Sequence, residues 1–208
     1  MTERMKESSG QEQQKTGTRT GIRHIAAISV VLATAVFATF GGAGLHALGQ
    51  NDDKYSLKSP GGVAFSDFRG YEDWSVVSSA RMEAALPDEI LKVIVANPAM
   101  IKAYKAGTPG NGQPFPDGSM IVKLQWKPKK STEAPFAVDV PDVFKQAFVM
   151  EKDSKRFPKT GGWGYAVFNY DAASDKFTPD PAALADCGNS CHVAVKAKDY
   201  IFHPYQKR

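Results

Sequence analysis

Hydrophobic residues in the C-terminal two thirds of the chain occur in short runs that turn residues interrupt. Four of these runs are rich in β-branched and aromatic residues, which is typical of strands. The predicted strands cover residues 90–96, 119–126, 145–151 and 164–170. The segment 108–118 is rich in Pro and Gly and predicts a long loop before the second strand.

Short helices are predicted beside these strands. Residues 71–85 are read as a helix, although their Val-Val-Ser-Ser centre opposes that interpretation. Asn97 and Pro98 suit the N-cap and first position of a further helix, which Gly107 would end. A C-terminal helical stretch begins within residues 179–187. Short helices among strands in hairpin order predict an α+β fold with a mostly antiparallel sheet.

The first fifty residues do not carry the pattern of a folded domain. Residues 1–21 are polar and have no apolar period, which predicts a disordered cytoplasmic N-terminus. Residues 22–49 contain an uncharged apolar run behind basic residues, which predicts a signal peptide or a transmembrane helix that anchors the chain in the membrane. Cleavage before Gln50 and an uncleaved anchor both stay open, and a buried core helix is the weaker alternative.

The remaining chain is expected to be a polar linker over residues 50–64 and one domain over residues 65–208. Basic residues stay on the cytoplasmic side of a membrane, so we expect the domain in a periplasmic or other extracytoplasmic space. The whole chain has a net charge of +4, part of which lies in the N-terminal extension. Such a weakly basic domain gives no electrostatic case for nucleic acid as a partner.

The sequence CGNSCH, from Cys187 to His192, holds the only two cysteines of the chain. Covalent haem attachment needs two thiols and a histidine directly behind the second, whose imidazole reaches the iron. The usual spacing is C-x-x-C-H, and this motif has one residue more between its thiols. Gly188 and Asn189 tolerate positive φ and could absorb the extra residue as a bulge, which makes the longer spacing sterically plausible.

Other interpretations of this motif are open on its residues alone. In an oxidising compartment Cys187 and Cys191 could form a local disulfide, which would make the domain structural. A zinc site would need a further ligand such as His203, and His192 could be an ordinary histidine beside a disulfide. Haem c is favoured because it uses the three motif residues together. A dedicated Met-ligated carrier is the weaker alternative, with candidate distal ligands at Met82, Met100, Met120 and Met150.

The chain from about Phe65 to its C-terminus resembles the cytochrome P-460 family and the related cytochromes c-prime-beta. The stretches that carry the resemblance are YEDWSVV, VIVANPAMIKAY, PDGSMIVKLQW, KDSKRF, GGWGYAVFNY and CGNSCHVAVKAKDYIFHPY. The resemblance implies a β-rich fold with one c-type haem, a proximal histidine at His192, an open or weakly occupied distal side and often a homodimer. In members that oxidise hydroxylamine, a lysine is bonded to the haem edge, and the matching residue is Lys123.

Lys123 has two competing interpretations. Strand alternation places it with Ile121 and Gln125 on the face opposite Val122 and Leu124, and by itself predicts a solvated side chain. The resemblance instead implies a pocket lysine with a lowered pKa that acts as a nucleophile toward the haem. The cross-link and its absence stay equally open.

Further pocket candidates are weaker. Lys92 lies where hydroxylamine-oxidising relatives carry an arginine, and a strand-edge charge is the preferred interpretation. The segments 126–130 and 199–205 are expected to be a solvated turn and a C-terminal strand or tail that closes the pocket. Aromatic residues that could line the pocket are Phe148, Trp163, Tyr165 and Phe168. The acids in range as a distal proton acceptor are Glu133, Asp139, Asp142 and Glu151, and none is distinguished.

The resulting hypothesis is an exported c-type haem protein with Cys187 and Cys191 as thioether attachments, His192 as the iron ligand and Lys123 as the candidate cross-link. The resemblance implies redox chemistry on small nitrogen compounds, hydroxylamine or nitric oxide, with electrons passed to an external acceptor. The alternative is a non-catalytic nitric oxide binding protein or sensor of the c-prime-beta kind.

Overall fold

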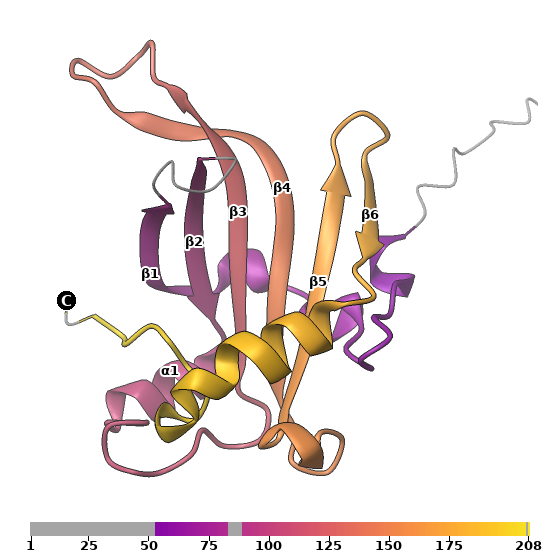
Figure 1. Ribbon diagram of the computed structural model, residues 1–208. Coiled ribbons are helices and arrows are strands. Elements are labelled where there is room, and N and C mark those ends of the chain that lie inside the picture. The colour runs from indigo at the N-terminus through magenta and orange to yellow at the C-terminus, as the bar shows by residue number, and fades with distance from the viewer. Residues whose placement is uncertain (1–52, 83–88, 207) are drawn as a thin grey trace, which may run out of the picture. The chain divides into compact units, whose positions relative to one another are not determined.

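The computed structural model describes residues 53–82, 89–206 and 208. These residues form a six-stranded antiparallel sheet in which each strand pairs with the next one along the chain (Figure 1). The α+β fold with a mostly antiparallel sheet is thereby confirmed. The strands are β1 (Ser75–Met82), β2 (Ile90–Ala96), β3 (Met120–Lys130), β4 (Asp139–Lys152), β5 (Trp163–Asp171) and β6 (Lys176–Pro179).

The helical elements are short and lie on both sides of this sheet. They are η1 (Lys54–Ser56), η2 (Phe65–Phe68), η3 (Tyr71–Asp73), α1 (Pro98–Lys105), η4 (Pro158–Thr160), the π-helix η5 (Leu184–Cys191) and η6 (His192–Lys198). The C-terminal helical stretch, yellow in Figure 1, crosses the face of β3, β4 and β5. It begins at Leu184, within the stretch that the sequence predicts to be helical.

Two hydrophobic clusters cover the two faces of the sheet. One joins α1 and the C-terminal tail to strand residues such as Ile94, Ile121 and Tyr165. The other joins η2 and η3 to the alternate strand residues, among them Val122 and Phe168. Because side chains alternate along a strand, each of the four central strands β2, β3, β4 and β5 contributes to both clusters. The sheet therefore has no fully solvated face in its central part.

The helix predicted over residues 71–85 is wrong in its main part. Among residues 71–82, the described part of that range, only η3 is helical, and β1 follows from Ser75. Val77 is buried, whereas its neighbour Val76 is 41% exposed, so the segment alternates with the period of a strand. Pairing with β2 supplies the backbone hydrogen bonds that a helix would otherwise make. The strand preference of the two β-branched valines in the Val-Val-Ser-Ser centre therefore outweighs the helical tendency of the rest of the segment.

The solvated turn predicted over residues 126–130 is also wrong, because β3 continues through it to Lys130. It pairs there with the first part of β4, which begins at Asp139, before the predicted start at residue 145. Pro128 lies opposite Pro141, and the register shifts beside this pair. Proline lacks the N–H of a regular ladder, so strands tolerate it at such irregularities.

The predicted start of α1 is confirmed. The Asn97 side-chain oxygen accepts hydrogen bonds from the N–H groups of Met100 at 3.0 Å and Met120 at 3.2 Å, and its amide donates to the Gly118 carbonyl at 2.8 Å. One side chain thus caps the helix and joins it to the start of β3. Gly107 follows the helix with φ of 98°, as the sequence predicts for its end.

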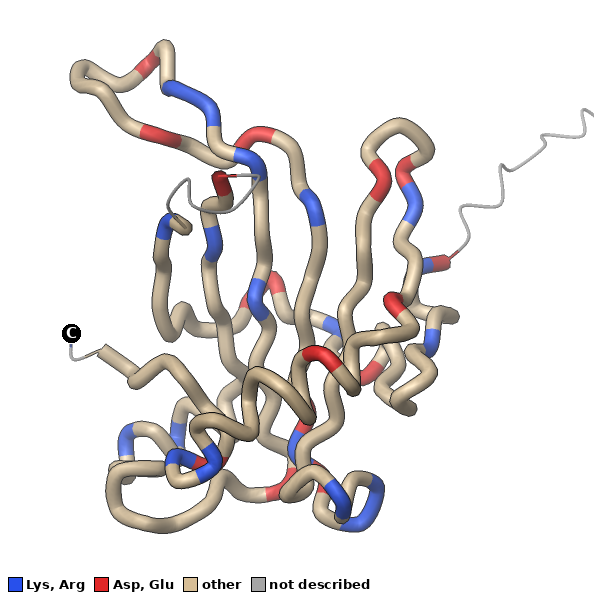
Figure 2. Tube along the Cα trace, viewed as in Figure 1, with Lys and Arg blue, Asp and Glu red and all other residues tan. Residues whose placement is uncertain are grey.

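Folded structure extends upstream of Phe65. Within residues 53–64, Lys58 forms a β-bridge with Ala64, and Val63 is completely buried in the cluster around η2. The predicted disordered segment 1–21 and the membrane-targeting segment 22–49 lie outside the described residues. Within residues 53–82, 89–206 and 208, no helix is long and apolar enough to cross a membrane. Basic and acidic residues are interspersed along this part of the chain (Figure 2).

Candidate functional site

A cavity of about 620 Å³ lies between the sheet and the C-terminal segment. This volume is within the range of about 300–1,000 Å³ that is usual for ligand sites. Its wall combines strand residues, most of them on the α1 side of the sheet, with residues that follow β6. The lining residues are Lys92, Ile94, Ile121, Lys123, Phe148, Val149, Met150, Tyr165, Ala166, Cys187, Cys191, His192, Ile201, Phe202 and His203.

Cys187, Cys191 and His192 of the CGNSCH motif line the same side of the cavity. They lie together because η5 is a π-helix. The His192 N–H donates to the Cys187 carbonyl, so one hydrogen bond spans five residues and encloses the motif. An α-helix would span four. The wider turn accommodates the additional residue between the thiols and keeps both cysteines and the histidine on the cavity side.

The π-turn absorbs the extra residue, but without the positive φ that the sequence suggests for Gly188 and Asn189, since neither residue has one. Gly188 instead allows η5 to approach the sheet closely. A Cβ at position 188 would lie 2.7 Å from Cδ2 of Tyr165, closer than real side chains approach. Gly188 is needed because η5 packs directly against the ring of this β5 residue.

His192 has one ring nitrogen committed to the backbone. Its Nδ1 lies 2.6 Å from the carbonyl oxygen of Tyr200. A carbonyl oxygen only accepts, so Nδ1 carries the proton and Nε2 keeps a free lone pair. The rings of Tyr165 and Phe202 flank the imidazole, with centroids 5.3 and 4.9 Å away. Burial lowers the pKa of His192, which favours the neutral form that a metal ion requires.

Both thiols are free, so the structure gives no support to a Cys187–Cys191 disulfide. Burial raises the pKa of the Cys187 thiol, and the charge of Lys123 opposes this. Among the described residues, no group of three or more His, Cys, Asp and Glu side chains could hold a metal ion. The zinc interpretation through His203 therefore has no ligand set in this part of the chain, although His203 lines the same cavity.

Lys123 lies in the cavity wall rather than on a solvated face. In the sheet it is paired between Ile94 of β2 and Phe148 of β4. Its Nζ lies 3.6 Å from the centre of the Phe148 ring, a cation–π geometry. Burial lowers the pKa of Lys123 to about 8, and the charge of Lys92 acts in the same direction. The exposed position predicted by alternation is wrong because the C-terminal segment covers this face.

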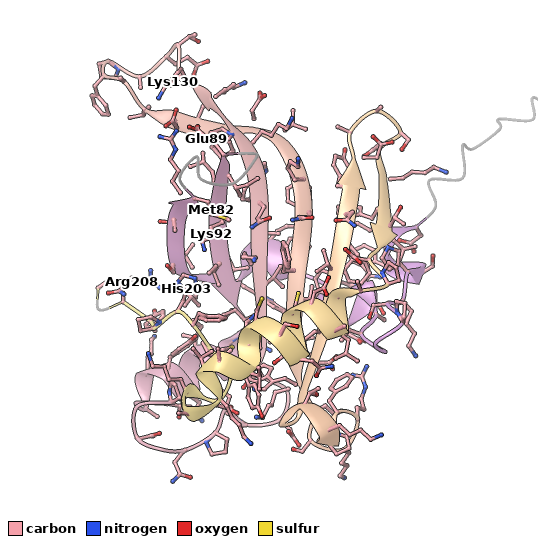
Figure 3. All side chains as sticks on the ribbon, in the orientation of Figure 1. Met82, Glu89, Lys92, Lys130, His203 and Arg208 are labelled. Carbon is pink, nitrogen blue, oxygen red and sulfur yellow. The ribbon has the colours of Figure 1, made fainter. Side chains whose placement is uncertain are left out.

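The weaker pocket candidates divide into two groups. Lys92 and Met150 line the cavity, as do two of the four aromatic candidates, Phe148 and Tyr165. Trp163 packs in the core around α1, and Phe168 belongs to the opposite face of the sheet. The segment 199–205 forms an irregular tail rather than a strand, and three of its residues line the cavity. Figure 3 shows His203 of this tail near Lys92 of β2.

No carboxylate lines the cavity within the described part of the chain. Three of the four candidate acids form ion pairs elsewhere: Asp139 with Arg81, Asp142 with Lys129, and Glu151 with Arg156. Glu133 is exposed in the β3–β4 loop. Burial raises the pKa of Glu151 to about 7, but this side chain does not face the cavity.

Sequence reasoning missed the role of Tyr200, which acts through its backbone carbonyl and carries no side-chain signal. It also missed Ile201 and Phe202 as individual lining residues. The hydroxyl of Tyr165 is buried and has no hydrogen-bond partner among the described residues. Burial raises the pKa of Tyr165 well above its ordinary range, so the hydroxyl stays protonated. An orphaned donor beside free thiols and a free imidazole nitrogen fits a cavity built to hold a larger group.

The sequence profile of the cytochrome P-460 family matches residues 68–203. The chain belongs to the cytochrome P-460 family. The match spans the whole described cavity wall, from Lys92 to His203. Among curated proteins, no significant match is found. Membership in the cytochrome P-460 family implies a c-type haem protein, and the donor set and volume of the cavity fit such a group.

Proposed function

We propose that this cavity holds one covalently attached haem c. Thioether bonds to Cys187 and Cys191 would fix it to η5, and Nε2 of His192 would be the proximal iron ligand. The observation that supports this most is the His192–Tyr200 hydrogen bond of 2.6 Å, because it commits Nδ1 and leaves Nε2 free. Carbonyl or carboxylate partners of this kind orient metal-binding histidines in general.

The bound haem would supply an iron centre for electron transfer and for binding small nitrogen ligands. We propose oxidation of hydroxylamine or nitric oxide as the reaction. Oxidation of hydroxylamine releases protons and electrons, so it requires a proton acceptor and an external electron acceptor. Among the described lining residues, His203 is the candidate to take a proton, because burial lowers its pKa and keeps the imidazole neutral.

Lys123 is the proposed point of a cross-link to the ring edge. Its pKa of about 8 leaves a fraction of neutral amine at neutral pH, and only the neutral amine is a nucleophile. Formation of the N–C bond would release one proton from the amine N–H, one proton from the ring C–H and two electrons in total. An oxidant such as hydrogen peroxide would have to accept these protons and electrons and would be reduced to water. Such a bond would alter the electronic properties of the ring.

A second candidate function is non-catalytic binding or sensing of nitric oxide. The cavity favours it in one respect, since its described lining contains no carboxylate to accept protons during turnover. Apolar side chains such as Ile94, Ile121 and Phe148 suit a neutral diatomic gas. In this alternative Lys123 would remain unmodified.

The proposal includes export by residues 22–49, which places the domain in a periplasmic or other extracytoplasmic space, either free or anchored by that segment. It also includes a homodimer, as the family resemblance implies. The cell location can be tested by fractionation, and the dimer by light scattering of the purified protein.

The deciding experiment is an intact mass and a ferrous absorption spectrum of the chain, expressed in a host that attaches haem to exported proteins. We expect a haem adduct that is lost in Cys187→Ser/Cys191→Ser. Colourless protein without the adduct would refute the proposal. A strongly red-shifted ferrous Soret band that Lys123→Ala returns to its ordinary position would support the cross-link. An ordinary band without hydroxylamine turnover would favour gas binding.

A further inference from the structure

A buried ion pair joins the end of β4 to the C-terminal tail, outside the cavity. The Lys152 Nζ lies 2.8 and 3.0 Å from the two carboxylate oxygens of Asp199. The two side chains are only 6% and 11% exposed. The ammonium also donates to the Gly161 carbonyl at 2.9 Å, so this buried charge is well coordinated.

Asp199 has a second fixed contact from another part of the chain. Its Oδ2 accepts a hydrogen bond of 2.8 Å from the N–H of Phe115, in the loop between α1 and β3. The carboxylate therefore connects that loop, β4 and the tail. Lys152 belongs to the sheet and Phe115 to the core, so their contacts fix the position of the Asp199 carboxylate.

The backbone at this position adopts an unusual corner. Asp199 and Tyr200 have φ values of 47° and 65°, a conformation that residues other than glycine rarely adopt. Such backbone persists only where the surrounding structure imposes it. The Tyr200 ring packs over Gly161, where any Cβ would overlap it. The ion pair and this packing together impose the corner.

The corner determines where the Tyr200 carbonyl points. That carbonyl accepts the 2.6 Å hydrogen bond from Nδ1 of His192 and so determines the orientation of the ring. A chain of direct contacts thus leads from Lys152 through Asp199 and Tyr200 to His192. Neither Lys152 nor Asp199 lines the cavity, so both act at a distance.

We propose that the Lys152–Asp199 ion pair is a positioning device for His192: it sets the strength of the Nδ1 hydrogen bond and thereby the basicity of Nε2 as an iron ligand. The inference rests on the proposed role of His192 as proximal ligand. A histidine whose Nδ1–H bond is strong is a more basic ligand and favours the ferric state. Loosening the ion pair should weaken this preference even though no cavity residue changes.

The test uses the haem-loaded full chain with Asp199→Asn and Lys152→Met. Asp199→Asn keeps an oxygen for the Phe115 N–H but loses the charge. Lys152→Arg retains the charge and should rescue part of the effect. The matched control is Phe65→Leu, which loosens the core on the opposite face of the sheet without touching this chain of contacts.

The readouts are the ferrous iron–histidine stretching frequency by resonance Raman spectroscopy and the midpoint potential. We expect both ion-pair variants to lower the frequency and to raise the potential. Changing the direct hydrogen-bond partner of a ligating histidine alters metal binding by about 10–100-fold. The ion pair acts one contact further away, so we expect at most a tenfold loss of ferric preference, which corresponds to ~59 mV for one electron. Phe65→Leu should lower the melting temperature and leave both readouts unchanged.

An unchanged frequency and potential in a folded, haem-loaded Asp199→Asn protein would overturn the inference and leave the ion pair a stabilising contact only. The same shift in Phe65→Leu would also overturn it, because general loosening would then explain the effect. If the unsubstituted chain carries no haem, the proposed function itself fails. That result is distinguishable from the first two because it precedes any substitution.

Discussion

The Lys123 Nζ lies 3.6 Å from the centre of the Phe148 ring, across the β3–β4 pair and inside the cavity. An aromatic face attracts a cation, but burial costs the ammonium its hydration. Burial dominates and lowers the pKa of Lys123 from 10.5 to about 8. The stability of the fold should therefore depend on the protonation state of Lys123.

The first prediction concerns the pH dependence of stability in the chain without haem. Between pH 8 and 10.5 the unfolded chain binds more protons at Lys123 than the folded chain does, so stability should rise with pH. The loss of stability caused by burying the charged Lys123 ammonium is complete below pH 8 and absent above pH 10.5. It is at most about 3 kcal/mol. Urea unfolding of the chain and of Lys123→Met should differ most at pH 7 and converge toward pH 10. Parallel pH profiles for the two proteins would contradict this.

Gly188→Ala should destabilise the domain by about 1–3 kcal/mol, because its Cβ would press against the Tyr165 ring and displace η5. The haem content should fall in parallel, since η5 carries both thiols. Chemical denaturation and intact mass measure the two effects. Asn189→Ala, at the exposed neighbouring position, is the matched control and should be close to neutral. Equal effects of the two substitutions would show that η5 does not pack as described.

Asn97→Ala should lower the free energy of unfolding by about 2 kcal/mol, the upper part of the range for a lost N-cap. The side chain serves both α1 and the start of β3, so its loss affects two elements. Asn97→Asp keeps the accepting oxygen and loses only the bond to the Gly118 carbonyl. We expect it to recover most of the stability in urea titrations. If Asp is as harmful as Ala, the accepting oxygen is not the main contribution.

The two histidines of the cavity should behave differently. His192→Gly should abolish the ferrous spectrum of a histidine-ligated haem, and added imidazole should restore it in part because the substitution leaves room for a free ligand. His203→Ala should retain that spectrum, because His203 lies in the tail without the Nδ1–carbonyl bond that orients His192. If the spectrum is lost in His203→Ala but retained in His192→Gly, the axial ligand is His203 and the assignment to His192 is wrong.

Several elements were predictable because their signals are local. The β-branched run of β2, the Asn97–Pro98 start of α1 and the loop before β3 depend on neighbouring residues only, and the structure confirms them. The motif of Cys187, Cys191 and His192 was evident from its composition. The resemblance of the domain to the cytochrome P-460 family was also evident from the sequence, and it is confirmed over residues 68–203.

Tertiary structure decided the rest, because burial depends on what covers a residue. The position of Lys123 changed from a solvated face to a cavity wall once the C-terminal segment packed over the sheet. Pairing with β2 turned a marginal helical stretch into β1, and packing of Gly188 on Tyr165 accompanies a π-turn that takes up the extra residue without positive φ. The contacts from Lys152 to His192 join residues far apart in sequence through backbone and buried charge. The sequence by itself therefore determined the donor groups and most strands, whereas only the folded chain brought the donors together and oriented them.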